Sequence, residues 1–236
     1  MSRNLPVKLR RSAWLDVALP CGASARLPVA RPSFPSWTGE PVFTYGGKPL
    51  LDYDGKVCFA ELLILRLLLK SGWSGTWVET FGGVHYLQSM PASWTLARHH
   101  IPIPADKHEL LRQIAREAKT DSCFDVFVWS GERVLFCEAK GLGDGWTKPQ
   151  LKFIQGALDC GIAPQALLLV QWSYLETAAH RGGHMVAADN GGEPDQSKPI
   201  DQRQVGVQAD QSVDTSGNKK ARRAAATDQM PVDLRS

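Results

Sequence analysis

The stretch FDVFVWSGERVLFCEAKG, residues 124–141, decides the fold of this chain. Residues 124–129 and 133–140 are rich in aromatic and β-branched side chains, which is typical of strands bounded by a turn. Gly131 and Glu132 are the two central turn residues, and glycine in the first of these positions suits a tight hairpin. The stretch therefore predicts two antiparallel strands that are apolar on both faces, as in a sheet covered by helices.

Charged residues stand at the open end of this predicted hairpin. Pairing across the turn places Asp125 opposite Glu138, where like charges are destabilising. Lys140 faces the same side as Glu138, because side chains two residues apart in a strand share a face. Such a carboxylate pair favours a hard cation such as Mg²⁺. A structural ion-pair network is the alternative, and a turn shifted by one residue would change the register.

A third acid lies in the most apolar part of the chain. Residues 56–72, KVCFAELLILRLLLKSG, predict a buried helix that ends at a glycine. Glu61 lies inside this run, where an unpaired carboxylate is costly or becomes protonated. It therefore needs a partner, either the metal site or, across the helix surface, Arg66 or Lys56.

The rest of the folded region alternates strand and helix patterns. Asp106 with Glu109, and Thr147 with Gln150, form two capping-box patterns that precede amphipathic stretches. The order of elements predicts an α/β fold with a mixed central β-sheet flanked by helices on both faces. The further predicted elements are a strand at 75–80, helices at 107–119 and 148–160, and a strand at 165–172.

Composition divides the chain into three parts. Residues 1–42 are rich in proline and are expected to be irregular. Residues 43–178 carry the strand and helix patterns and form the predicted domain. Residues 179–236 are polar and contain no aromatic side chain, so this tail is expected to be disordered.

Charge, cysteine content and hydropathy limit the cellular setting. The net charge of +3, from 27 basic and 24 acidic residues, is too small to indicate a nucleic-acid partner by itself. The five cysteines include no C-x-x-C pair, which indicates reduced thiols in a cytoplasmic protein. The longest apolar run is interrupted by charges and is too short to cross a bilayer, so no membrane partner is expected.

The ordered set of polar residues resembles the PD-(D/E)XK nuclease superfamily, which has the restriction-endonuclease-like fold. Residues 124–172 are similar in particular to a VRR-NUC domain, with its Asp, Glu-x-Lys-Gly and Gln pattern. Two features depart from the family: Phe124 stands where Pro or Gly is frequent, and residues 81–105 have no counterpart. The resemblance implies Asp125 and Glu138 as metal ligands, Lys140 as the catalytic lysine, Gln150 as an active-site polar residue and Glu61 as the first-helix acid and a further metal ligand.

The sequence therefore predicts a nuclease that hydrolyses phosphodiester bonds in DNA with Mg²⁺, or Mn²⁺ in its place. One alternative is a catalytically silent nucleic-acid-binding module with the same fold. Another is a structural or interaction protein of a mobile element. The intact set of Asp125, Glu138 and Lys140 favours the nuclease over the silent module, because binding alone does not need all three.

Overall fold

The computed structural model of the protein places its described residues in the first of two units, Met1–Met185. The second unit, Val186–Ser236, lies outside the described residues, and so does the predicted tail at 179–236. The described residues are 5–42, 44, 47–80, 83–91 and 100–175.

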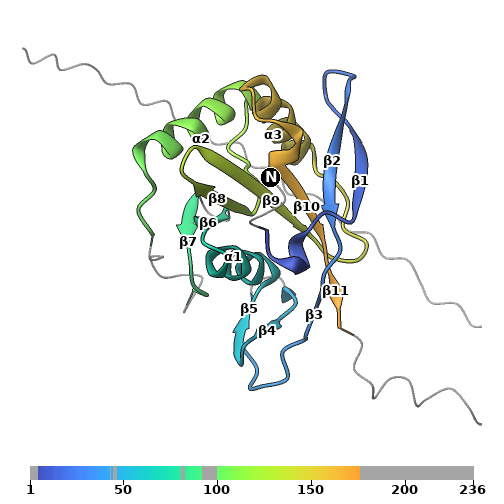
Figure 1. Ribbon diagram of the computed structural model, residues 1–236, viewed down its shortest axis with the longest axis vertical. Coiled ribbons are helices and arrows are strands. Elements are labelled where there is room, and N and C mark those ends of the chain that lie inside the picture. Colours follow the sequence, from blue (N-terminus) through green and yellow to red (C-terminus); the bar gives the residue numbers. More distant parts are fainter. Residues whose placement is uncertain (1–4, 43, 45–46, 81–82, 92–99, 176–236) are drawn as a thin grey trace, which may run out of the picture. The chain divides into compact units, whose positions relative to one another are not determined.

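The described residues form an α/β fold, as the sequence predicts (Figure 1). Its helices are α1 (Ala60–Lys70), α2 (Ala105–Ala118) and α3 (Lys148–Asp159), with short 3₁₀ turns at Val7–Leu9 and Pro164–Ala166. The strands of the main sheet are β1 (Ala13–Ala18), β2 (Ser24–Ala30), β6 (Ser74–Glu79), β7 (His85–Leu87), β8 (Val126–Ser130), β9 (Arg133–Lys140) and β10 (Leu167–Gln171). Two small ladders pair β3 (Ser33–Phe34) with β11 (Ser173–Tyr174), and β4 (Leu51–Tyr53) with β5 (Lys56–Cys58).

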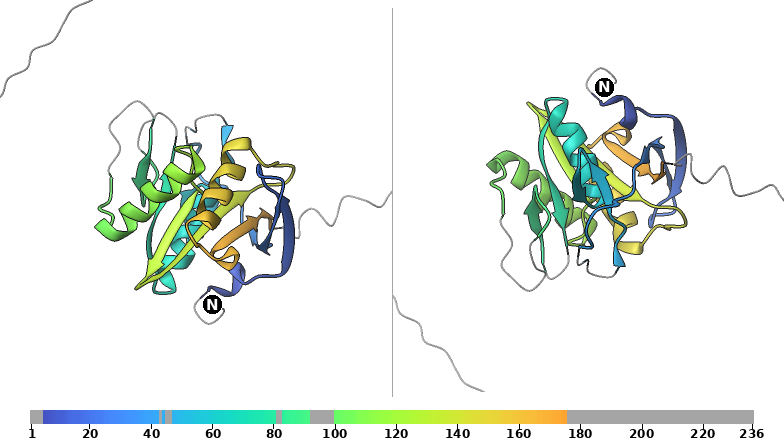
Figure 2. Two further views of the ribbon diagram at one scale, coloured as in Figure 1. Left: turned by 90° about the horizontal axis from the view of Figure 1, so that it is seen from above. Right: turned by 90° about the horizontal axis from the view of Figure 1, so that it is seen from below.

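The main sheet is mixed and has the strand order β1-β2-β10-β9-β8-β6-β7. The strand β10 runs parallel to both of its neighbours, β2 and β9, and the other neighbouring pairs are antiparallel. Helix α1 covers one face, and helices α2 and α3 cover the other (Figures 1 and 2). The prediction of a mixed sheet with helices on both faces is confirmed.

Alternation along β9 decides which charges face which layer. Leu135 and Cys137 belong to the core beneath α1, whereas Phe136 belongs to the core shared with α2 and α3. Glu138 and Lys140 continue the side of Phe136, so they face the layer that contains α3.

The hairpin of β8 and β9 has the predicted register. Its pairs include Val126 with Cys137, Phe127 with Phe136, and Trp129 with Val134. The turn consists of Gly131 and Glu132, and the glycine has a φ of 60°, which side chains other than glycine rarely adopt. Asp125 directly precedes β8 and is thereby brought to the position across from Glu138.

The expectation that residues 1–42 are irregular is wrong, because β1 and β2 form a hairpin within them. This hairpin extends the main sheet through parallel pairing of Val29 with Leu169 and of Ala30 with Val170. Pro28 weakens the strand pattern in the sequence but lies inside β2. Pairing with a strand about 140 residues later overrides the local preference, as tertiary context often does for strands.

Smaller differences concern the beginnings of helices. Helix α1 begins at Ala60 rather than near residue 57, because Lys56–Cys58 form β5. Helix α2 has no side-chain cap, and Glu109 pairs with Arg112 and Arg116 instead. The capping box of α3 is confirmed, with Thr147 as the N-cap residue. None of the helices within the described ranges has the length and hydropathy needed to cross a membrane.

Candidate functional site

The candidate site lies at one end of the main sheet. Strand β9 ends at Lys140, β8 begins next to Asp125, and α3 begins two residues before Gln150. The loop between β9 and α3 keeps the helix close to the end of its preceding strand. Four of the five predicted site residues meet here: Asp125, Glu138, Lys140 and Gln150.

Lys140, Glu138 and Gln150 form a closed polar network. Lys140 Nζ lies 3.1 Å from Glu138 Oε1 and donates a hydrogen bond of 2.9 Å to Gln150 Oε1. Gln150 Nε2 donates to Glu138 Oε1. The backbone N–H of Thr147 also donates to Gln150 Oε1 at 3.0 Å, as part of the capping box. The N-terminus of α3 therefore holds Gln150 against both charged groups.

Aromatic packing holds the Lys140 ammonium in place. Its Nζ lies 5.4 Å from the centroid of the Trp146 ring, which is within the range of a cation–π interaction. Trp146 stacks on Phe124 with a centroid distance of 6.2 Å. The Lys140 residue is only 8% exposed, so the site contains a fixed and largely desolvated cation.

Glu138 is nearly completely buried, with 2% of its surface exposed. Burial raises the pKa of its carboxyl to about 7; the charge and hydrogen bond of Lys140 oppose this rise, and the charge of Glu61 adds to it. Its Oε2 atom is buried and accepts no well-formed hydrogen bond among the described residues, although the backbone N–H of Asp125 also opposes the rise in pKa. This carboxylate therefore has unused acceptor capacity, which is costly in a buried group.

Asp125 is partly exposed and is held by the neighbouring strand. The backbone N–H of Ala139 donates a hydrogen bond of 2.9 Å to its Oδ2. Burial raises the pKa of Asp125 well above its usual value, and the negative charges of Glu138 and Glu61 raise it further. The Ala139 N–H and the Lys48 ammonium only partly oppose this rise. The two acids therefore form a pair with too little positive charge around it.

Glu61, the fifth predicted residue, lies in the first turn of α1 on the opposite face of the sheet. Its partner is Lys48, whose Nζ lies 2.5 Å from Glu61 Oε1. Arg66, a partner considered from the sequence, lies over the Tyr53 ring instead. The negative charge of Glu61 nevertheless contributes to the raised pKa of both Asp125 and Glu138.

Sequence reasoning did not single out Lys48. Burial lowers the pKa of this lysine, but Glu61, Asp125 and Glu79 outweigh that effect, and the net shift is upward. Its Nζ also lies 5.3 Å from the Phe59 ring centroid. A single lysine in a loop carries no pattern that marks it, so only the folded chain reveals this role.

The pair of Asp125 and Glu138 fits a divalent cation. Both acids have raised pKa values, and Glu138 Oε2 has an unused lone pair in a buried position. Oxygen ligands of this kind are those that Mg²⁺ prefers. Across the described ranges, no three His, Cys, Asp or Glu side chains are grouped closely enough to hold a metal together. Glu61 belongs to α1, on the other face of the sheet from Glu138.

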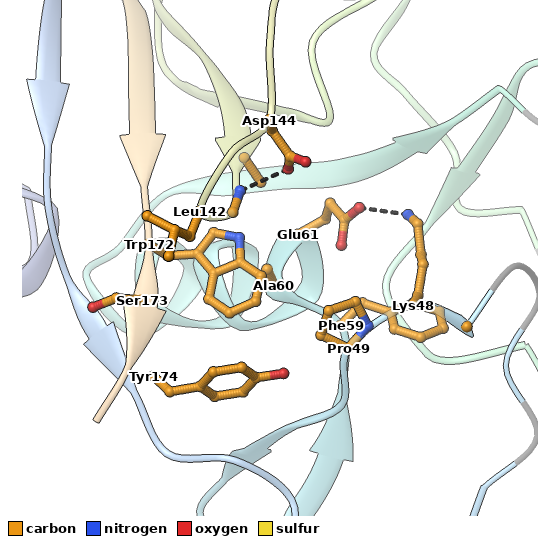
Figure 3. A pocket seen from close by; sticks show the side chains of 13 residues that line it. Lys48, Pro49, Phe59, Ala60, Glu61, Leu142, Asp144, Trp172, Ser173 and Tyr174 are labelled. Carbon is orange, nitrogen blue, oxygen red and sulfur yellow. Dashed lines mark hydrogen bonds and ion pairs between the residues drawn. The ribbon is translucent and has the colours of Figure 1, made fainter. Parts of the chain in front are cut away.

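Two hollows flank the charged cluster. On the α3 side, a cleft of about 790 Å³ is lined by Asp125 and Gln150, among others. On the α1 side, a cavity of about 470 Å³ is lined by Glu61, Ala139 and Trp172, among others (Figure 3). The α3-side cleft thus reaches Asp125 and Gln150 directly, whereas the α1-side cavity reaches Ala139, the residue between Glu138 and Lys140.

Comparisons of the chain with protein-family models, with curated proteins and with solved structures found no match. The class of protein is therefore defined by the geometry alone. It is an α/β protein with a seven-stranded mixed sheet, a buried glutamate and a partly exposed aspartate at the sheet end, and a buried lysine beside them.

Proposed function

We propose that the protein is a metal-dependent nuclease that hydrolyses phosphodiester bonds in DNA. The observation that carries this proposal is the acid pair of Asp125 and Glu138, which the β8–β9 register places opposite each other. Both acids have raised pKa values, and Glu138 Oε2 is buried without a well-formed hydrogen bond among the described residues. Such clusters of perturbed groups beside a cleft are typical of functional sites. A phosphodiester is a suitable substrate because a divalent cation held by the two acids and the Lys140 ammonium can both bind its anionic phosphate.

The acids Asp125 and Glu138 would hold Mg²⁺, or Mn²⁺ in its place. A divalent ion bound there supplies Lewis-acid activation of the phosphate and of the attacking water. The two acids hold their positions through the Ala139 N–H and the Gln150 amide. Glu61 adds negative potential that favours a cation at the pair.

Lys140 is the group that we assign to stabilising charge on the reacting phosphate. Gln150, Glu138 and Trp146 hold its ammonium in one place, so little reorganisation is needed when negative charge develops. Gln150 acts by positioning: its oxygen accepts from Lys140, and its amide donates to Glu138. This makes Gln150 both part of a helix cap and a support of the site.

We further propose that the fold contains a restriction-endonuclease-like core of the VRR-NUC kind. The order of elements supports this: α1 precedes three antiparallel strands, β6, β8 and β9, and α3 then leads to β10, which is parallel to β9. The five free cysteines suit a reducing compartment, which supports a cytoplasmic location.

The test is cleavage of linear, nicked, branched and circular DNA by the purified protein with Mg²⁺, Mn²⁺ or EDTA. Asp125→Ala and Glu138→Ala should abolish cleavage, because each removes a ligand of the ion. Lys140→Ala should retain metal-dependent thermal stabilisation but cut about 10²-fold more slowly, since it removes a positioned cation and no ligand. Glu132→Ala, in the exposed hairpin turn, is the matched control and should cut like the parent.

Other results would support different functions. A parent protein that binds DNA but cuts no substrate with any divalent ion would be a silent binding module. If the parent neither binds DNA nor gains thermal stability from metal, the network of Lys140, Glu138 and Gln150 has a purely structural role. Equal cleavage by the parent and by all three site variants would also contradict the proposal.

A further inference from the structure

The cavity on the α1 side adjoins the proposed active site. It has a volume of about 470 Å³, within the usual size of ligand pockets, about 300–1,000 Å³. Ala139, which lines it, lies between Glu138 and Lys140 in β9. Neighbouring side chains of a strand point to opposite faces, so the cavity lies just across the sheet end from the acid pair.

Two aromatic rings form one side of this cavity (Figure 3). Trp172 and Tyr174 meet edge to face, with ring centroids 5.6 Å apart and planes at 90°. Their backbone is held on both sides: Trp172 N–H donates to Lys140 O at 2.9 Å, and Leu175 N–H donates to Phe34 O at 2.8 Å. The rings are therefore presented by paired backbone rather than by a free loop.

Three charged residues, Lys48, Glu61 and Asp144, also line the cavity. Figure 3 shows Glu61 and Lys48 across from the aromatic side, and Asp144 above Trp172 next to Leu142. Lys48 pairs with Glu61, and Gly141 N–H donates to Asp144 Oδ2 at 2.7 Å. Each carboxylate has a second oxygen, so further acceptors are available in the same cavity as the aromatic rings. Flat apolar faces beside such acceptors suit a planar ring that has exocyclic amino groups.

We propose that this cavity binds an unpaired nucleobase of the strand whose backbone lies at Asp125, Glu138 and Lys140. The inference rests on the proposed function in taking nucleic acid as the substrate. The ring of the base lies against Trp172 and Tyr174, and amino groups on its edge donate to Glu61 or Asp144. A base inside a continuous duplex cannot enter, because it must first unstack and unpair. The preferred substrate is therefore single-stranded or locally unpaired.

The test distinguishes affinity for the bases from affinity for the phosphate backbone. Binding of a fluorescein-labelled single strand, and of an abasic strand of equal length, is measured by fluorescence anisotropy in EDTA. The parent should prefer the strand with bases by about 5-fold or more, as expected when at least one base stacks on an aromatic ring. Trp172→Ala should remove this preference, and Trp172→Phe should keep most of it.

Matched variants make the result specific to the cavity. Trp14→Ala removes a ring in β1 that lies 4.5 Å from the Arg11 guanidinium and does not line the cavity, so the preference should stay. Tyr174 is 49% exposed, so Tyr174→Ala should leave the fold intact. It replaces Trp172→Ala in the test if the latter lowers the melting temperature. An abasic strand that binds the parent equally well, or Trp172 and Tyr174 variants that keep the preference, would overturn the inference.

The two proposals can fail separately. If the protein cuts DNA but shows no preference for bases, the cavity proposal fails and the nuclease stands. If the preference depends on Trp172 but no DNA is cut with any divalent ion, the nuclease fails and the nucleobase site stands.

Discussion

Replacing Glu138 with Gln should remove the part of the pH dependence that Glu138 itself imposes on the stability of the metal-free protein. In the folded state, burial raises the pKa of Glu138 from 4.5 to about 7, even though the Lys140 ammonium opposes the rise. In the unfolded chain the same carboxyl is in water and has its ordinary pKa. Gln is nearly isosteric, and its oxygen can still accept from Gln150.

The direction in which stability changes with pH follows from the number of protons that each state binds. Between about pH 4.5 and 7 the folded state holds a proton that the unfolded state has released, so the free energy of unfolding falls as pH rises. The loss is complete above the folded pKa. At about 1.4 kcal/mol per pKa unit, the rise from 4.5 to about 7 corresponds to about 3 kcal/mol. Asp125, whose pKa burial also raises, adds to the loss in the same direction.

The measurement is urea unfolding in EDTA at about pH 5 and about pH 8, on either side of the Glu138 titration. Between these values the parent should lose about 2.5 kcal/mol more stability than Glu138→Gln, because at pH 5 the unfolded carboxyl is already mostly ionised. Glu132→Gln, in the exposed turn of the same hairpin, should behave like the parent. Adding Mg²⁺ at the higher pH should restore stability to the parent and much less to Glu138→Gln.

Equal pH dependence in the parent and Glu138→Gln would refute this reasoning. It would mean that Glu138 is solvated well enough to ionise in the folded protein without cost. A parent whose stability rises across the same window, while Glu138→Gln does not change, would reverse the sign and exclude a raised pKa.

Two further predictions concern helix α3. Gly156→Ala places a Cβ 2.6 Å from both the Cβ and the backbone N of Ala118 in α2, so thermal unfolding should show a loss of about 1–3 kcal/mol from overpacking. Gly145→Ala, where no atom lies within 4 Å of the added Cβ, is the control, and equal melting of the two would contradict the close packing. Thr147→Ala breaks the capping box, so chemical unfolding should show a loss of about 1 kcal/mol, whereas Thr147→Ser should retain the cap. Because the Thr147 hydroxyl accepts from the Gln150 backbone N–H and so helps to place Gln150, the Ala variant should cut DNA more slowly. Unchanged stability and cleavage would show that the cap contributes nothing.

The sequence alone determined the features that depend on neighbours along the chain. The register of β8 and β9 follows from a two-residue turn that contains Gly131, so the approach of Asp125 to Glu138 could be predicted. The capping box of α3 depends on two residues three positions apart, Thr147 and Gln150. Each feature is decided within a short segment, where spacing and residue type are sufficient.

Only the tertiary structure decided the features that join distant segments. The hairpin of β1 and β2 joins the sheet through β10, so local proline signals gave the wrong expectation for residues 1–42. The pairing of Glu61 with Lys48 and the placing of Trp172 beside Ala139 likewise depend on how the layers pack. Such contacts are stabilised by burial and by charge pairing between segments that lie far apart in the sequence. No local sequence pattern connects these segments, so the contacts form only when the sheet and its helices have assembled.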